Sequence, residues 1–342
     1  MSKPKVSVIM PVYNTEKYVE EAINSILNQT FRDFEFIIID DASTDKSVEI
    51  VKGFKDERIK LITKPFNTGY TDSLNKGLEL ANGKYIARMD SDDISLPTRL
   101  EKQVKFLDNN PDVILCGTWF ELLNKEKSIF NYPTNPEEVK ATLLNYCSIG
   151  HPTVMFRKEI FNTHGLSYDK SMEPAEDYNL WVDISSIGKL ANIGEVLFQY
   201  RTHQNQVSNK RAEQQKLNSQ IARFKMLSNL NHGLELESIF PESTKPISQK
   251  QLENVFLNLM KLEKINSENK VFETKLFENS LNAFRREIAF EYFMIEKNYN
   301  ITSFFLLLKT SAYRRCFEKK TLIKLYIKCL INYKSETVSY QN

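Results

Sequence analysis

The sequence contains few cysteines, no long apolar run and, in its second half, no aspartate. Its four cysteines are widely spaced and form no Cys-x-x-Cys pair, which argues against a disulfide framework or a zinc site and fits a reducing compartment. No stretch approaches the roughly 20 uninterrupted apolar residues of a membrane-spanning helix. The apolar run that ends at Pro11 is too short for a signal peptide. We therefore expect a cytoplasmic protein, at most peripheral on the inner face of the plasma membrane.

The distribution of charge divides the chain in two. The 342 residues carry a net charge of only +2, but residues 1–210 hold 25 basic and 30 acidic side chains, whereas residues 211–342 hold 21 and 14. No aspartate follows Asp183. Because aspartate caps helices, forms turns and binds metal ions, its confinement to the first half places the chemistry there. We predict two domains, residues 1–210 and a basic, helical domain at 211–342.

Short apolar runs alternate with amphipathic helical stretches in the first half. The predicted strands are VSVIM (6–10), EFIIIDD (35–41), IKLIT (59–63) and KYIARM (84–89). Strands that alternate with helices of 10–15 residues favour a right-handed, mainly parallel α/β sheet with flanking helices. Asn14 and Thr15 offer N-cap side chains for a helix that extends to about Gln29.

Polar and acidic residues follow three of these strands, at the sheet edge where such folds bind ligands. They are residues 11–14, Asp40 with Asp41, and residues 90–93. The pattern suggests a nucleotide site, but the chain has no Gly-x-Gly, which excludes the usual dinucleotide fingerprint. Without a glycine nest or a lysine clamp, the charge of a diphosphate needs a divalent cation, and the aspartates of residues 90–93 are suitable ligands.

Three segments resemble the family 2 glycosyltransferases, which have the Rossmann-like GT-A fold. They are VSVIMPVYNTEKYVEEAINSILNQTFRDFEFIIIDDASTDKS, NTGYTDSLNKGLELANGKYIARMDSDDISLPTRL and AEDYNLW. The similarity covers about residues 4–210, whereas residues 211–342 match no family pattern. It implies an inverting transfer of a hexosyl or N-acetylhexosaminyl group from a nucleotide-diphosphate donor, usually UDP-linked, to a hydroxyl. The acceptor would be a saccharide or a lipid-linked saccharide in the synthesis of a surface polysaccharide.

The resemblance also implies roles for the residues of the donor site. In an extended Asp-x-Asp, Asp90 and Asp92 point to the same side, so Asp92 would bind Mg²⁺ or Mn²⁺ and Asp90 the ribose or the waters of the ion. The alternative is a solvated acidic turn that caps a helix near Pro97.

Further positions match the nucleoside pocket and the loop that faces the donor. Pro11, Tyr13 and Asn14 lie in the first segment; Tyr13 would stack on the base, and Asp41 would accept a hydrogen bond from a uracil N–H. Tyr13 as a core residue and Asp41 as a helix cap are the alternatives. Asn75, like Gly69, matches the donor-facing loop and helix, and a packing role is an equal alternative.

For catalysis, the resemblance implies that Asp177 is the general base that takes the proton of the acceptor hydroxyl. Since a helix N-terminus favours an ionised carboxylate, we expect Asp177 to be a charged, weak base; a purely stabilising carboxylate is the alternative. His203 is a candidate metal ligand or phosphate partner beside Arg201, with a structural role as the alternative. His151 is expected to line the acceptor side, and the two other histidines, His164 and His232, to lie in loops or at the surface.

Two other functions fit parts of the pattern. A sugar nucleotidyltransferase shares the α/β core and the carboxylate-bound metal, but it usually has a glycine-rich basic loop, which the chain lacks. A non-catalytic protein that binds nucleotide sugars would retain the donor site and tolerate the loss of Asp177.

The second half reads as amphipathic helices at residues 211–232, 248–264, 273–297 and 303–333. In the last helix Lys320, Lys324 and Lys328 recur every fourth residue among leucines and isoleucines. A basic helix with a broad apolar face suits an anionic membrane surface. Packing of these faces inside a helical bundle or a homodimer is the favoured alternative. Nucleic-acid binding is not expected, because no recognised motif accompanies the charge.

Overall fold

The computed structural model describes residues 3–123, 128–202, 211–241, 247–295, 300–309, 311–314 and 317–330. The chain forms two compact units, residues 1–226 and 227–342. The sequence-based boundary at residue 210 lies before helix α9 (Ala212–Ser228), most of which belongs to the first unit. The side chains of Asn218 and Arg223 explain this, since they donate hydrogen bonds to the carbonyl oxygens of Glu173 and Leu144.

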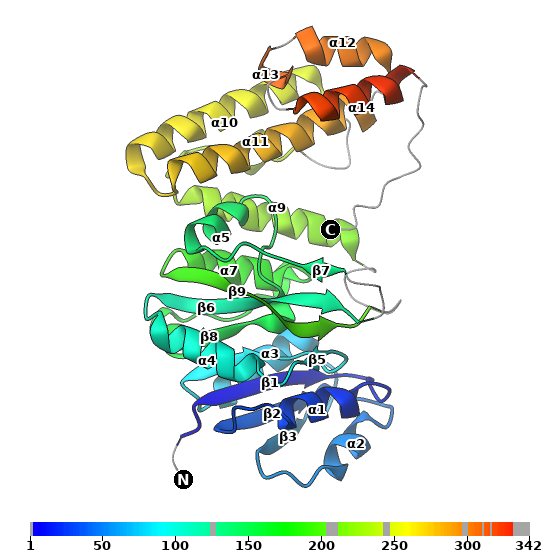
Figure 1. Ribbon diagram of the computed structural model, residues 1–342, viewed down its shortest axis with the longest axis vertical. Helices are drawn as coiled ribbons and strands as arrows, with labels where there is room; N and C mark the ends of the chain where they lie inside the picture. Colours follow the sequence, from blue (N-terminus) through cyan, green and yellow to red (C-terminus); the bar gives the residue numbers. More distant parts are fainter. Residues whose placement is uncertain are drawn as a thin grey trace. The chain divides into compact units, whose positions relative to one another are not determined.

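Within the described residues, nine strands of the first unit form a single sheet (Figure 1). The strands are β1 (Val6–Val12), β2 (Phe34–Asp40), β3 (Ile59–Thr63), β4 (Tyr85–Arg88), β5 (Ile94–Ser95), β6 (Val113–Leu122), β7 (Ile129–Phe130), β8 (Met155–Arg157) and β9 (Lys189–Tyr200). Their order is β3-β2-β1-β4-β8-β6-β9-β5, and β7 pairs with β6. The four predicted strands are confirmed and are mutually parallel, whereas β8 runs antiparallel to both β4 and β6. The α/β class is therefore confirmed, with a mixed sheet.

Helices flank this sheet. They are α1 (Val19–Leu27), α2 (Ser47–Gly53), α3 (Tyr70–Leu80), α4 (Arg99–Asn109), α5 (Pro136–Thr142), α6 (Glu159–His164), α7 (Glu176–Ser185) and the short 3₁₀ turns His151–Thr153 and Lys170–Met172. The strands β1 and β2 are buried along almost their whole length, and the inner face of α1 belongs to the same apolar core. Apolar residues make up most of this layer, and the buried Ser7 and Glu35 satisfy each other with a hydrogen bond from Ser7 Oγ to Glu35 Oε1 at 2.6 Å.

The predicted capping of α1 by Asn14 and Thr15 is wrong. The helix begins at Val19, without a side-chain cap. Asn14 has a φ of 52°, and its Oδ1 accepts a hydrogen bond from Thr44 N at 2.8 Å. The Asn14 side chain therefore joins the loop after β1 to the loop after β2 instead of capping the helix.

The second unit is helical, as predicted. Its helices are α10 (Gln249–Asn269), α11 (Thr274–Phe290), a π-helical turn (Glu291–Ile295), α12 (Ile301–Lys309), α13 (Ser311–Arg314) and α14 (Lys319–Leu330), with a 3₁₀ turn at Leu236–Ser238. The single helix predicted at 303–333 is wrong, because the chain turns at Phe317, whose side chain is buried and whose N–H bonds to Arg314 O. None of the described helices combines the length and apolar character that a membrane crossing requires.

Candidate active site

The carboxyl ends of β1, β2 and β4 deliver the predicted polar residues to one edge of the sheet, because these strands are parallel neighbours. The loops after β1 and β2 are bonded to each other, and Asn14 N donates to Ser43 Oγ at 3.0 Å. Asn14 and Ala42 both have positive φ angles, of 52° and 60°. Such backbone strain in non-glycine residues is held in place by surrounding contacts and clusters at functional sites.

Tyr13 lies at this edge with 48% of its surface exposed, so it is not a core residue. Pro11, two residues earlier, is partly buried at the end of β1. An exposed aromatic ring beside the strand ends offers a flat apolar face, as stacking on a nucleobase requires.

Asp41 is buried and organises the loop that precedes α3. Its two carboxylate oxygens accept hydrogen bonds from Thr68 N at 3.0 Å and from Gly69 N at 2.8 Å, and Lys64 Nζ lies 2.5 Å from Oδ1. Asp41 therefore does not cap α2. Gly69 has a φ of +101°, which L side chains rarely adopt, so this carboxylate fixes a turn that needs glycine.

Asn75 makes both of its side-chain hydrogen bonds to one backbone position. Asn75 Nδ2 donates to Tyr168 O and Tyr168 N donates to Asn75 Oδ1, each at 2.9 Å. The structure thus places this amide in the packing role that the sequence left open, where it joins α3 to the segment after α6.

The acidic run after β4 forms a compact cluster of carboxylates. Oxygens of Asp90, Asp92 and Asp93 lie within 4.8 Å of one another. Arg88, the last residue of β4, contacts both oxygens of Asp90, at 2.6 and 2.7 Å. Asp93 Oδ1 accepts a hydrogen bond from Arg201 N at 2.8 Å, whereas the buried Asp93 Oδ2 has no hydrogen-bond partner among the residues that the structure describes.

The electrostatics of this cluster favour a cation. Burial, and then the charges of Asp90 and Asp92, raise the pKa of Asp93 well above its usual range. Burial also raises the pKa of Asp90, although Arg88 opposes the shift. An unpartnered buried carboxylate oxygen among like charges fits a hard divalent cation, which takes carboxylate oxygens as ligands. The sequence had given Asp93 no separate role, and the length of the acidic run was the only signal for it.

Arg201 holds the turn that carries these carboxylates. Its Nε donates to Asp92 O at 2.7 Å, its Nη2 lies 2.5 Å from Glu21 Oε2, and its guanidinium stacks 4.7 Å from the ring centroid of Tyr18. His203, the tentative third metal ligand, lies outside the described residues.

A second group of titratable side chains surrounds Asp177, on the first turn of α7. Its neighbour Glu176 is buried and accepts a hydrogen bond from the Tyr70 hydroxyl at 2.7 Å. His151 Nδ1 lies 3.6 Å from Glu176 Oε1 and 3.9 Å from Asp177 Oδ2, distances too long for hydrogen bonds. The other ring nitrogen of His151 lies 3.2 Å from the Tyr168 hydroxyl.

Burial changes the acid–base properties of this pair. Burial and the neighbouring Asp177 raise the pKa of Glu176 to about 8. Burial raises the pKa of Asp177 to about 6, although Tyr178 N–H and the Arg88 guanidinium both favour its ionised form. Asp177 is therefore ionised at neutral pH, as expected, but it is a stronger base than the helix N-terminus alone would leave it, because desolvation raises its pKa.

The two groups of carboxylates share Arg88. Besides its ion pair with Asp90, its charge opposes the rise in the pKa values of Glu176 and Asp177. Burial, and then the same Arg88 charge, hold the pKa of His151 well below the usual range, so His151 is a neutral imidazole at physiological pH. The sequence placed His151 only on the acceptor side and missed both Arg88 and Tyr70.

Neither His164 nor His232 belongs to these groups. His164 is exposed at the end of α6, as expected. His232 lies in the loop between α9 and the 3₁₀ turn, as expected, but it is buried there, and its Nδ1 accepts a hydrogen bond from Leu234 N at 2.9 Å.

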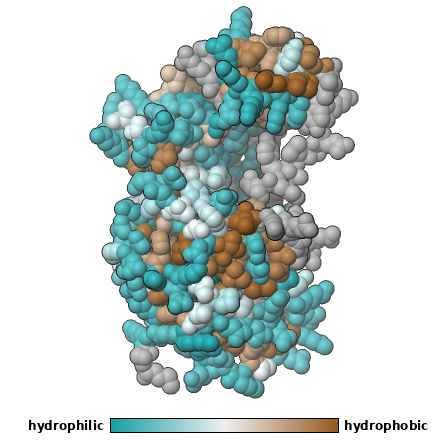
Figure 2. All heavy atoms as spheres, in the orientation of Figure 1, coloured by the Kyte–Doolittle hydropathy of each residue, from teal (hydrophilic) through white to brown (hydrophobic). Residues whose placement is uncertain are grey.

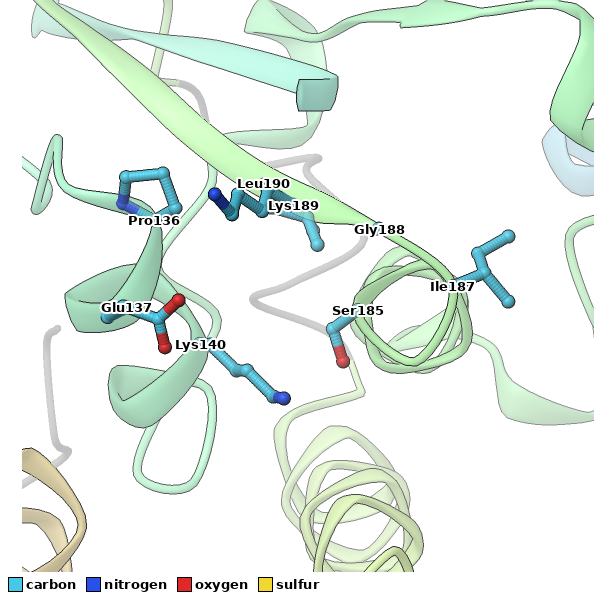
Figure 3. A pocket seen from close by; sticks show the side chains of 8 residues that line it. All are labelled: Pro136, Glu137, Lys140, Ser185, Ile187, Gly188, Lys189 and Leu190. Carbon is cyan, nitrogen blue, oxygen red and sulfur yellow. The ribbon is translucent and has the colours of Figure 1, made fainter. Parts of the chain in front are cut away.

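A cavity of about 250 Å³ lies away from the carboxylates (Figure 3). Its lining comes from α5, the carboxyl end of α7 and the start of β9: Pro136, Glu137, Lys140, Ser185, Ile187, Gly188, Lys189 and Leu190. Because Asp177 is on the first turn of α7 and Ser185 on its last, the cavity and the proposed base are at opposite ends of one helix.

Comparisons with known proteins agree with this geometry. The pattern of glycosyl transferase family 2 matches residues 7–165. The chain is 31% identical over 213 residues, 62% of its length and 82% of the relative's, to the Escherichia coli UDP-Glc:alpha-D-GlcNAc-diphosphoundecaprenol beta-1,3-glucosyltransferase WfgD. The chain therefore belongs to glycosyl transferase family 2.

Solved structures share its fold. TarS 1–349 of S. aureus in complex with UDP-GlcNAc superposes with a TM-score of 0.56 at 19% identity, over 96% of this chain and 89% of that one. The mannosyltransferase PcManGT of Pyrobaculum calidifontis, in complex with GDP-Man and Mn²⁺, gives 0.52 at 16% identity, over 98% and 89%. At these identities the likeness concerns the fold alone, and it confirms the GT-A assignment.

Proposed function

We propose that the protein transfers a hexosyl or N-acetylhexosaminyl group from a UDP-sugar to a hydroxyl of a saccharide or lipid-linked saccharide. The anomeric configuration would be inverted in a single displacement, during the synthesis of a surface polysaccharide. The observation that carries the proposal is that the charge of Arg88 acts on two groups of carboxylates. The group with Asp90 is suited to bind a cation, and the group with Asp177 is suited to accept a proton. The UDP-Glc donor and lipid-linked acceptor of the WfgD relative support the choice of substrates.

The donor would bind along the strand ends. Tyr13 would stack on the base, supported by its exposure, and Asn14 and Pro11 would shape the wall around it. Asp41 accepts hydrogen bonds from the backbone of Thr68 and Gly69, so in the proposed site it would fix the position of the loop beside the base. Its contact with the uracil would be limited to the edge of the ring.

Asp92 and Asp93, with Asp90 behind them, would hold Mg²⁺ or Mn²⁺, a choice that the Mn²⁺ of PcManGT supports. Such an ion neutralises a leaving nucleoside diphosphate. The chain's own contribution is a rigid ligand set, since Arg88 fixes Asp90 and the backbone of Arg201 fixes Asp93.

Asp177 would remove the proton of the attacking hydroxyl. With a pKa of about 6 it is ionised at neutral pH and more basic than an ordinary aspartate, whereas Glu176, at about 8, stays protonated beside it. A base whose pKa lies near the working pH is the more effective one. The Tyr70 hydroxyl, which donates to Glu176, would hold that member of the pair in place.

The proposal is tested with a panel of UDP- and GDP-sugars in the presence of MnCl₂. We expect slow hydrolysis of one UDP-sugar to free UDP, stopped by EDTA and declining below about pH 6 as Asp177 becomes protonated. Release of pyrophosphate would instead indicate a nucleotidyltransferase. The absence of both hydrolysis and a rise in Tm with UDP and Mn²⁺ would contradict the proposal.

A further inference from the structure

The outer face of α14 carries an apolar stripe in the second unit. Four large apolar side chains are 39–60% exposed there: Ile323, Tyr326, Ile327 and Leu330. Their spacing of three and four residues places them on one side of the helix. Leu325 and Cys329, on the other side, are buried. Figure 2 shows hydrophobic residues over α12 and α14 next to hydrophilic ones.

Basic side chains flank this stripe. The helix sequence KKTLIKLYIKCL contains four lysines and no acidic residue, and Lys319, Lys320 and Lys324 are exposed. Two of these lysines lie in the first turn, where positive charge opposes the helix dipole. The stability of the helix therefore does not account for the positions of these charges.

Packing against the described residues of the second unit does not account for the stripe. The helix contacts α12, and at the edge of the stripe the rings of Tyr326 and Phe304 lie 5.4 Å apart. The buried side chains of α14 are Leu325 and Cys329. Ile323 and Ile327 stay 60% and 52% exposed, which is costly for isoleucine in water. Packing inside a helical bundle, the favoured alternative from the sequence, thus buries only one side of α14.

We propose that the stripe of α14 docks on an anionic lipid bilayer. The apolar side chains would enter the boundary between headgroups and acyl chains, and the lysines would lie among the lipid phosphates. A second copy of the chain is a poorer fit, because a two-fold contact would place this lysine-rich face against itself. The proposal does not depend on the reaction at the carboxylates.

Flotation of the full-length protein with vesicles tests the proposal. At low salt we expect binding to vesicles that contain 30% phosphatidylglycerol, little binding to pure phosphatidylcholine, and release by 0.5 M NaCl. The triple variant Lys319→Glu, Lys320→Glu, Lys324→Glu should weaken the partition coefficient by roughly 100-fold. Ile323→Ser with Ile327→Ser should weaken it by about tenfold.

Two matched variants control for charge and apolar area. Lys250→Glu, Lys264→Glu, Lys275→Glu changes net charge equally on exposed positions of α10 and α11, and Leu257→Ser with Met260→Ser removes exposed apolar side chains from α10. Both should bind like the original chain. Equal binding by the α14 variants and their controls would overturn the proposal. So would a dimer, seen by light scattering, that binds no vesicles and dissociates when Ile323 and Ile327 are replaced by serine.

Discussion

Adjacent carboxylates in one helix turn acquire different proton affinities in this protein. The Glu176 side chain is 4% exposed and bonded to the Tyr70 hydroxyl, whereas the Asp177 side chain is 20% exposed and accepts the backbone N–H of Tyr178. Burial and the charge of Asp177 raise the pKa of Glu176 to about 8. Burial raises the pKa of Asp177 only to about 6, opposed by the Tyr178 N–H and the Arg88 charge. Between these values one residue holds a proton and the other is free to accept one, a division of roles that acid–base catalysis requires.

Glu176→Gln should make the protein's stability less dependent on pH. The folded pKa of about 8 lies above the ordinary value of 4.5, so the folded chain keeps a proton that the unfolded chain loses. Stability should thus fall as pH rises from about 4.5 to 8, by at most about 1.4 kcal/mol per unit. The glutamine substitution removes this loss, and urea unfolding at several pH values measures the difference.

A control for this comparison is Glu20→Gln, since Glu20 is an exposed residue of α1. Its stability should follow that of the original chain at every pH. If Glu176→Gln gave the same pH profile as the original chain, Glu176 would titrate normally and the account of its burial would be wrong.

Asp93→Asn should weaken binding of Mn²⁺ and leave the metal-free protein at least as stable. The substitution removes a buried charge whose Oδ2 has no hydrogen-bond partner in the described part of the chain, so the apo Tm should stay equal or rise. The Mn²⁺ concentration that gives half of the Tm shift should increase by about tenfold or more. The control is Asp112→Asn, at an exposed residue paired with Lys189, and it should change neither the apo Tm nor the Mn²⁺ response. If Asp93→Asn left the Mn²⁺ response unaltered, Asp93 would be excluded as a ligand.

At the scale of residues, the sequence identified the site residues that directly follow strands. It missed the site residues whose role depends on contacts with other segments. Asp90, Asp92 and Asp41 follow apolar runs, so their place at the sheet edge was predictable. Tyr70 contacts a carboxylate 106 residues away and belongs to no local pattern. Arg88 ends a strand but reads as an ordinary polar residue until its ion pair with Asp90 is seen.

Among the elements, α3 packs tightly on the sheet because it has a glycine at the contact. A Cβ on Gly77 would lie 2.4 Å from Ile9 Cγ2 in β1, whereas one on Gly53 in α2 would meet nothing within 4 Å. Gly77→Ala should therefore cost about 1–3 kcal/mol of unfolding free energy. Gly53→Ala should be neutral or stabilising by up to about 1 kcal/mol. Urea unfolding compares the two, and equal effects would mean that α3 moves freely on the sheet.

Element boundaries were predictable where the hydrophobic pattern alone decides them. The apolar runs 6–10 and 59–63 became β1 and β3, the latter with identical bounds. The start of α1 and the break at Phe317 were not predictable in this way. Asn14 accepts a hydrogen bond from Thr44 instead of capping the helix, and the Phe317 side chain is buried. Both depend on contacts with other segments, which a local pattern does not contain.

At the scale of the whole molecule, the charge division has a structural counterpart. The aspartates are confined to the first unit, where two carboxylate groups lie around Arg88, and the second unit is helical with a lysine-rich face on α14. In the proposed function, the first unit would provide the donor edge, the cation ligands and the proton acceptor, and the second unit has a basic surface on α14. The family 2 pattern matches residues 7–165, which lie within the first unit, and this unit also contains all the residues of the proposed chemistry.

The most direct test of the account is the rate of sugar transfer in Asp177→Asn, measured with the donor identified in the nucleotide-sugar panel. The kcat should fall by about 10²–10⁴-fold because the general base is lost, while the Kd for UDP with Mn²⁺ stays within about threefold. Asp183→Asn is the control on the same helix, where Asp183 pairs with Lys225 at 2.6 Å, and it should retain the original kcat. An Asp177→Asn variant with unchanged kcat would contradict the account.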